Sequence, residues 1–142
     1  MIVSKEKIES YIPQRAPFIM IDNLVEANVE MFKTNFLVLP GNIFVERGIL
    51  REFALIENIA QSSSAGLAIT KMPAGKKAID GFIGGISKLR LYDLPQVGDI
   101  IDTTITVVGR LENMFLLKGE NYVNGKKLLE CEIKLVGLNA KG

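Results

Sequence analysis

The segment from residue 46 to residue 71 constrains the fold of this chain more than any other. Apolar and small side chains recur there at steps of three and four residues, the spacing of one face of a helix. Further apolar residues fill much of the remaining surface, and a helix that is apolar on nearly all sides is buried. The pattern predicts a long buried helix over residues 46–71, ended by a turn at residues 73–75. The stripe consists of Ile49, Phe53, Ile56, Ala60, Ser64 and Leu67, and the other faces carry Leu50, Ala54, Leu55, Ile59 and Ala65.

The segments before this helix predict a short helix and a pair of strands. Ser4 is a candidate cap for the short helix, and Pro13 marks its end. Residues 17–31 are expected to form a strand that enters the core, and residues 32–39 are expected to be its hairpin partner. Residues 40–42, with the sequence Pro-Gly-Asn, have the composition of a loop.

After the long helix the chain is almost entirely strand. Residues 95–99 predict a turn, and Asn124 followed by Gly125 is a strong signal for a tight hairpin. Gly84 and Gly85 predict a bulge in a strand, or a place where another backbone or an acyl chain passes close. The expected strands cover residues 78–94, 100–111, 115–123 and 126–138.

This order of elements selects a class of fold. Strands that follow one another without intervening helices exclude a doubly wound parallel sheet. The sequence instead predicts an α+β fold, in which a curved and mostly antiparallel sheet wraps around one long buried helix. A chain of 142 residues is long enough for one such core, so we expect a single domain over residues 1–142.

Charge and composition exclude several classes of function. The 17 basic and 16 acidic residues are well mixed and leave a net charge of +1, so neither nucleic acid nor a membrane surface is an expected partner. With no histidine and a single cysteine, Cys131, we expect no metal site and no cofactor. The same absence removes His-dependent nucleophiles from the isolated chain. Because the sequence shows no signal-peptide pattern and no membrane-length apolar stretch, we expect a cytoplasmic protein.

Four stretches of the sequence are similar to a known family. They are IPQRAPFIMIDNLVE at residues 12–26, LIENIAQ at residues 55–61, FIGGISKLRLYDLPQVGDII at residues 82–101 and KGENYVNGKKLLECEI at residues 118–133. In this order they resemble the 3-hydroxyacyl-ACP dehydratases, and the similarity is greatest to a dehydratase-like subgroup associated with the biosynthesis of aryl-polyene pigments. The resemblance implies the hot-dog fold and chemistry on acyl thioesters carried by ACP.

One part of the chain departs from the pattern of that family. Active dehydratases carry a His-Phe-Pro-Gly type loop, whose His is the general base, and a later Pro-Gly that places a backbone N–H against the thioester carbonyl. Residues 39–57, LPGNIFVERGILREFALIE, contain no His and have Arg51 and Glu52 in place of that Pro-Gly. In the family the His and the acid face each other from opposite subunits of a dimer. A homodimer of this chain would therefore hold two acids and no base.

Glu57 is the candidate catalytic residue, because it matches the family's acid. The alternative is an acid at a subunit interface that bonds to backbone or to an arginine, since an isolated buried carboxylate is costly. Gln61 lies one helical turn further on the same face. It is a candidate substrate contact or, equally, an amide that satisfies backbone groups in the core.

Three other residues are candidates for substrate binding. Gly48, or the backbone amides near Arg51, would polarise a thioester carbonyl at the start of the helix. The alternative for Arg51 is a place in a solvated first helical turn. Gly85 is expected either to admit an acyl chain or to let the sheet bend.

Three functions fit these residues. The first is a dehydratase-like subunit that acts on or binds 3-hydroxyacyl or enoyl thioesters of ACP or CoA, in fatty-acid-like or aryl-polyene biosynthesis, with a His-bearing partner completing the site. The second is an acyl thioesterase that uses Glu57 as base or nucleophile. The third is a non-catalytic module for acyl-thioester binding or for scaffolding. In each case we expect a dimer, either of two copies or with another hot-dog subunit, because an open sheet leaves an edge uncovered.

Overall fold

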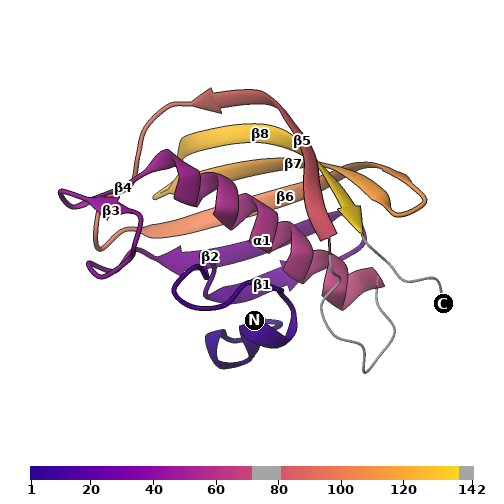
Figure 1. Cartoon of the computed structure of the whole chain (residues 1–142), viewed down its shortest axis with the longest axis horizontal. Coiled ribbons are helices and arrows are strands. Elements are labelled where there is room, and N and C mark those ends of the chain that lie inside the picture. The colour runs from indigo at the N-terminus through magenta and orange to yellow at the C-terminus, as the bar shows by residue number, and fades with distance from the viewer. Residues whose placement is uncertain (72–80, 138–142) are drawn as a thin grey trace.

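The computed structural model describes residues 1–71 and 81–137. Its centre is α1 (Glu52–Lys71), which lies across the concave face of a six-stranded sheet (Figure 1). A short 3-10 helix, η1 (Lys5–Ser10), precedes the sheet, and β3 (Val45–Glu46) and β4 (Ile49–Leu50) form a separate small hairpin. The strands of the large sheet follow the order β1 (Asn23–Ala27), β2 (Met31–Leu37), β6 (Ile100–Leu111), β7 (Met114–Val123), β8 (Lys126–Gly137) and β5 (Gly81–Leu91), and all neighbours are antiparallel.

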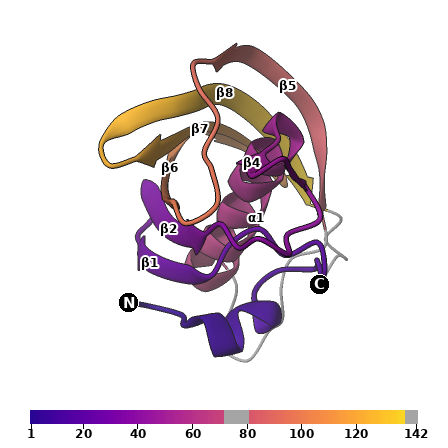
Figure 2. The ribbon, with the colours of Figure 1, turned by 90° about the vertical axis from the view of Figure 1, so that its left-hand side faces the viewer.

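The helix is buried as its sequence predicts. Residues 58–68 are buried without interruption. Seen from the side, the sheet arches over α1, with β1 at one end of the arch and β5 at the other (Figure 2). Two glycines allow the close approach of helix and sheet, because a Cβ at Gly66 would overlap the ring of Phe32 and a Cβ at Gly119 would overlap the side chain of Ile59. The predicted α+β architecture is confirmed.

The start of the helix differs from the prediction. Residues 46–50 were expected to be helical, but α1 begins only at Glu52 and residues 45–50 form the β3–β4 hairpin. Arg47 and Gly48 have φ of 54° and 81°, so two successive residues adopt the left-handed conformation of a tight hairpin turn. Ile49 and Leu50 fit the helical stripe by spacing, yet Leu50 donates a backbone hydrogen bond to Pro95 O. The helical spacing of apolar residues therefore extends into residues 45–50, although the backbone of that segment forms a hairpin.

The first strand is also shorter than predicted. Residues 17–31 were expected to be one strand, but β1 begins at Asn23, and the chain turns at residues 28–30. The carboxamide oxygen of Asn28 accepts hydrogen bonds from the backbone N–H groups of Glu30 and Met31, which explains the turn. The chain also turns at Ala16 and Pro17, where Phe18 N–H donates to Arg15 O at 2.9 Å, and residues 18–20 bond to side chains of α1, as described below.

The later strands follow the prediction closely. β6 buries Ile101, Thr103 and Ile105 and leaves the alternate residues less buried. Asn124 and Gly125 have φ of 50° and 79° and form the tight turn between β7 and β8. The register of β5 against β8 shifts between Ile83 and Gly85, which is the predicted bulge. The predicted turn at residues 73–75 and the first residues of the predicted strand 78–94 lie outside the described residues.

The two edges of the sheet differ. At the β1 edge, Ile2 and Val3 donate hydrogen bonds to Leu24 O, and Leu24 N–H donates back to Val3 O, so the N-terminal residues cover that strand. At the other edge, β5 has no neighbouring strand beyond it in the described part of the chain. Its Ile86, Leu89 and Leu91 are exposed. No helix within residues 1–71 and 81–137 is long and apolar enough to cross a membrane.

Candidate functional site

Glu57 and Gln61 lie one turn apart on the same face of α1. Glu57 is partly buried, and its Oε2 accepts a hydrogen bond of 3.0 Å from Gln61 Nε2. Within the described residues Glu57 has no ion-pair partner, so no arginine neutralises it. The hydrogen-bond partner of Glu57 is the Gln61 amide, and Glu57 Oε1 accepts no hydrogen bond from the described side chains. This leaves one carboxylate oxygen available to another molecule.

Gln61 holds this carboxylate in place and is itself fixed at both ends. It is fully buried; its Oε1 accepts a hydrogen bond of 2.6 Å from Met20 N–H, and its Nε2 also donates to Phe18 O at 2.9 Å. The side chain therefore bridges α1 and the segment of residues 17–22. The structure shows Gln61 satisfying backbone groups and orienting Glu57. Contact with a substrate remains a prediction.

Asn58 is a third polar residue in this part of α1, and no role was predicted for it. Its Nδ2 donates to Met20 O at 2.7 Å, so Asn58 and Gln61 together hold both polar backbone groups of Met20. Its Oδ1 accepts from Thr103 Oγ1 at 2.5 Å and from Asn121 Nδ2 at 3.1 Å. These buried bonds fix the rotation of α1 against β6 and β7, and hence the direction in which the neighbouring Glu57 points. The only sequence signal was a carboxamide inside an otherwise apolar helix.

The residues expected near the helix start lie around the β3–β4 hairpin. Gly48 occupies the turn, where its carbonyl accepts a hydrogen bond of 2.9 Å from Val97 N–H. Arg51 forms a two-point interaction with Glu52, with Nε–Oε1 at 3.0 Å and Nη2–Oε2 at 3.3 Å, and lies 3.9 Å from Glu46. Its backbone N–H donates to Phe44 O at 2.9 Å. The structure thus places Gly48 before the helix terminus and gives the amide of Arg51 a partner inside the chain.

Glu52 is the first residue of α1, and its carboxylate bonds to one of the backbone N–H groups at the start of the helix. A hydrogen bond from its own backbone N–H lowers the pKa of its carboxyl, with a further contribution from Arg51, although slight burial opposes this. The carboxylate is therefore ionised at neutral pH and sits where the helix dipole favours negative charge. Of the candidate residues, the structure brings together Glu57 and Gln61. Gly85 lies elsewhere, in the bulge of the exposed edge strand β5.

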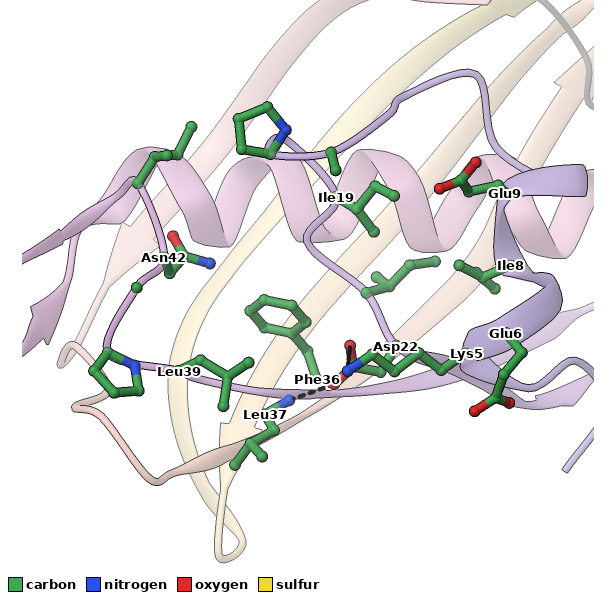
Figure 3. A pocket seen from close by; sticks show the side chains of 16 residues that line it. Lys5, Glu6, Ile8, Glu9, Ile19, Asp22, Phe36, Leu37, Leu39 and Asn42 are labelled. Carbon is green, nitrogen blue, oxygen red and sulfur yellow. Dashed lines mark hydrogen bonds and ion pairs between the residues drawn. The ribbon is translucent and has the colours of Figure 1, made fainter.

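A cleft of about 700 Å³ opens next to the segment of residues 17–22 that bonds to α1 (Figure 3). Its walls come from η1, from the segment before β1 and from the end of β2 with the loop that follows. Asp22 lines the cleft, where it accepts a hydrogen bond of 2.8 Å from Leu37 N–H and lies 4.0 Å from Lys5 Nζ. Neither Glu57 nor Gln61 lines it. Because three distant segments form this cleft, no local pattern in the sequence indicated it. Its apolar lining includes Ile8, Pro17, Ile19, Ile21, Phe36, Leu39 and Ile43.

The structure offers little for metal or thiol chemistry. No group of three or more His, Cys, Asp or Glu residues in the described part of the chain is arranged to hold a metal ion. Cys131 is buried in the core, and burial raises the pKa of its thiol to about 11. A thiol with such a pKa is protonated at neutral pH and is a packing residue.

Comparison with known proteins assigns the chain to a family. The family model described as ApeP-like, ApeP dehydratase, matches residues 6–139. The chain belongs to the ApeP-like family. The predicted dehydratase-like family is thus confirmed.

Curated relatives of this ApeP-like chain are dehydratases. The 3-hydroxyacyl-[acyl-carrier-protein] dehydratase FabZ of Campylobacter lari is 23% identical over 139 residues, covering 90% of this chain and 92% of its own length. The FabZ of Enterococcus faecalis is 26% identical over 141 residues, covering 89% of this chain and 92% of its own length.

Solved structures show the same fold. A chain of the dehydratase heterocomplex ApeI:P from Xenorhabdus doucetiae matches with a TM-score of 0.85 and 16% identity, covering 94% of this ApeP-like chain and 91% of its own. A hypothetical thioesterase from Streptococcus pneumoniae, solved with coenzyme A, matches with a TM-score of 0.68 and 9% identity, covering 84% of this chain and 90% of its own. The predicted hot-dog fold is confirmed.

Proposed function

We propose that this chain is the acid-bearing subunit of a two-subunit dehydratase for 3-hydroxyacyl thioesters on acyl carrier protein. The observation that carries the proposal is the partly buried Glu57, oriented by Gln61 in a chain that contains no histidine. A second hot-dog subunit supplies the histidine. The pathway we expect is fatty-acid-like or aryl-polyene biosynthesis, in the cytoplasm.

The chemistry divides between the two subunits. The histidine of the partner removes a proton from the carbon next to the thioester carbonyl, and negative charge develops on the carbonyl oxygen. The bond between the next carbon and its hydroxyl then breaks, and Glu57 donates its proton to the leaving hydroxyl to form water. In the reverse direction, Glu57 removes a proton from water as the oxygen adds to the enoyl double bond, and the protonated histidine of the partner returns a proton to the carbon next to the carbonyl. Each subunit alone lacks one of the two groups.

The edge strand supports assembly with another chain. In the described part of the chain no strand pairs with the outer side of β5, and β5 carries exposed apolar residues; edge pairing covers such a strand. The similarity to a chain of the ApeI:P heterocomplex supports a partner with the same fold. We therefore place the partner along β5, with the two sheets continuous across the contact.

The experiment that tests this function is hydration of an enoyl-ACP. The purified chain is assayed alone, mixed with a His-bearing hot-dog dehydratase subunit of the same organism, and mixed again as Glu57→Gln. Activity in the natural mixture that exceeds that of either component, and that is lost with Glu57→Gln, supports the proposal. Equal activity in the mixture and in the partner alone overturns it.

A thioesterase that uses Glu57 is the second candidate, favoured by the likeness to a hot-dog thioesterase solved with coenzyme A. Such a reaction needs backbone donors for the oxyanion. At this helix start the amide of Arg51 donates to Phe44 O, and the amide of Glu52 is bonded to its own carboxylate. Dehydration also needs such donors, but in a two-subunit site the partner chain can supply them, and this favours the partner-subunit function. Turnover of an acyl-CoA panel by the chain alone, lost in Glu57→Gln, would favour the thioesterase instead. Binding of acyl thioesters without turnover in any mixture would favour a non-catalytic module.

A further inference from the structure

The free edge of the sheet carries a second feature, a hollow of about 580 Å³ on its outer face. The hollow opens where β5 bulges between Ser87 and Arg90, with Lys88 at a φ of 54°. Arg90 pairs directly with Glu130 in the register of β5 and β8, so both side chains point to the same face of the sheet. Because Leu129 and Cys131 of β8 point into the core, that face is the one turned away from α1. The hollow is lined by Lys88, Leu89, Arg90, Lys118, Glu130, Cys131 and Glu132.

The acids of this hollow are already paired. Glu130 accepts hydrogen bonds from Lys127 Nζ at 2.7 Å and from Tyr92 OH at 3.1 Å, and Glu132 lies 3.5 Å from Lys88 Nζ. Neither Arg90 nor Lys118 has a carboxylate within 4.0 Å among the described residues, although Lys118 acts on Glu120 and Glu130 at longer range. The lining holds three cations and two acids, so the hollow carries a net charge of +1 directly beside the edge that another strand would cover.

The composition of β5 decides which strand fits there. The strand GFIGGISKLRL contains two cations, Lys88 and Arg90, and no acid. In an antiparallel pair of two copies about a two-fold axis, a cation that faces another residue of β5 meets an uncharged residue or a second cation. The β5 strand of a second copy therefore offers no carboxylate, whereas a different chain can place one opposite Arg90. Opposite charges in such positions stabilise a sheet, and like charges destabilise it.

We propose that the β5 edge selects its partner by charge, and that Arg90 binds a carboxylate on the edge strand of a different hot-dog chain. Lys118 adds to the positive potential deeper in the hollow. This inference rests on the proposed function, because it concerns the same partner subunit, and it explains why the natural assembly is a pair of unlike chains. Complementary charge sets the choice of partner, while the apolar residues of β5 supply contact area.

The test measures binding of the purified chain to the His-bearing subunit that completes the hydration assay, by surface plasmon resonance at low and high salt. Arg90→Glu is expected to weaken binding about tenfold at low salt and to flatten the salt dependence, since an attraction becomes a repulsion. Arg90→Lys is expected to retain most of the affinity. Lys7→Glu is the matched control: it makes the same change in net charge at an exposed site on η1, which packs against β1 at the opposite edge.

The outcomes separate the two proposals. Weakening by Arg90→Glu but not by Lys7→Glu supports charge selection at β5. Binding that Arg90→Glu leaves unchanged overturns this inference while the two-subunit function stands. Equal weakening by both variants also overturns it, because net charge would then explain the effect. If no hot-dog partner binds at all, the two-subunit function fails, and the inference fails with it.

Discussion

Gln61 Nε2 lies 3.0 Å from Glu57 Oε2 and 2.9 Å from Phe18 O, so one buried amide connects the candidate acid to the chain segment that crosses the helix. The third bond of the same side chain, from Met20 N–H, prevents the amide from rotating. The position of the Glu57 carboxylate is therefore coupled to the packing of residues 17–22 on α1.

Gln61→Ala is expected to lower the free energy of unfolding by about 2–4 kcal/mol, because it leaves the buried Met20 N–H and Phe18 O without their partner. It should also reduce the hydration activity of the two-subunit mixture, since Glu57 loses its only amide donor in the described chain. Urea denaturation and the hydration assay measure the two effects. Gln96→Ala, at an exposed position, is the control and should change neither. An unaltered midpoint for Gln61→Ala would contradict the bridging role of Gln61.

Asn58→Leu should destabilise the fold by about 2–4 kcal/mol, because three buried polar groups on three different segments lose a partner. These groups are Met20 O, Thr103 Oγ1 and Asn121 Nδ2. Ser63→Ala, also in the buried part of α1, removes only a bond to Ile59 O within the helix and should cost much less. Thermal or urea unfolding of both variants provides the comparison. Equal costs would show that the network around Asn58 has no special role.

Gly119→Ala tests the close contact of β7 with α1. A Cβ at this position would overlap the side chain of Ile59, so we expect a loss of about 1–3 kcal/mol in the free energy of unfolding. Gly109→Ala is a matched control in β6, where an added Cβ would meet its nearest atom, Leu116 Cβ, at 3.9 Å. If chemical denaturation finds the two variants equally stable, helix and sheet are less tightly packed at Gly119 than the overlap with Ile59 implies.

The buried thiol predicts a pH dependence. Burial raises the pKa of Cys131 to about 11, whereas a thiol in an unfolded chain has a pKa of about 8.5. The stabilisation that comes from keeping the thiol neutral is complete below the unfolded value and declines as the pH rises towards the folded value. The difference in unfolding free energy between the natural chain and Cys131→Ala should therefore shrink between pH 8 and pH 10.5. A difference that stays constant over this range would contradict the raised pKa.

Periodicity and turn chemistry predicted the later part of the fold well. The alternation of Ile101, Thr103 and Ile105 and the turn at Asn124 and Gly125 are local signals that nothing in the tertiary structure opposes. The helix start was wrong because Ile49 and Leu50 keep the helical spacing while Arg47 and Gly48 reverse the chain. Apolar spacing reports which residues face the core, and both a helix and a small hairpin can bury Leu50 and partly bury Ile49.

The candidate site was predictable only in part. Glu57 and Gln61 could be paired from their spacing of four residues on one helix. Residues 18–20 were not expected to bond to that helix, because their sequence fits a strand and the partners are 38 to 43 positions away. Asn58 was overlooked for the same reason: three of its partners, Met20, Thr103 and Asn121, belong to distant segments of the chain. Long-range side-chain bonds to the backbone leave no periodic trace in a sequence.

The most direct test of the two-subunit account is the rate of enoyl-ACP hydration by a one-to-one mixture of this chain and its His-bearing partner, with natural Glu57 and with Glu57→Gln. Loss of a general acid typically costs about 10²–10⁴ in rate, so the account predicts at least a hundredfold loss in the mixture while the complex still forms. A mixture that hydrates enoyl-ACP equally well with Glu57→Gln would contradict the assignment of the acid to this chain.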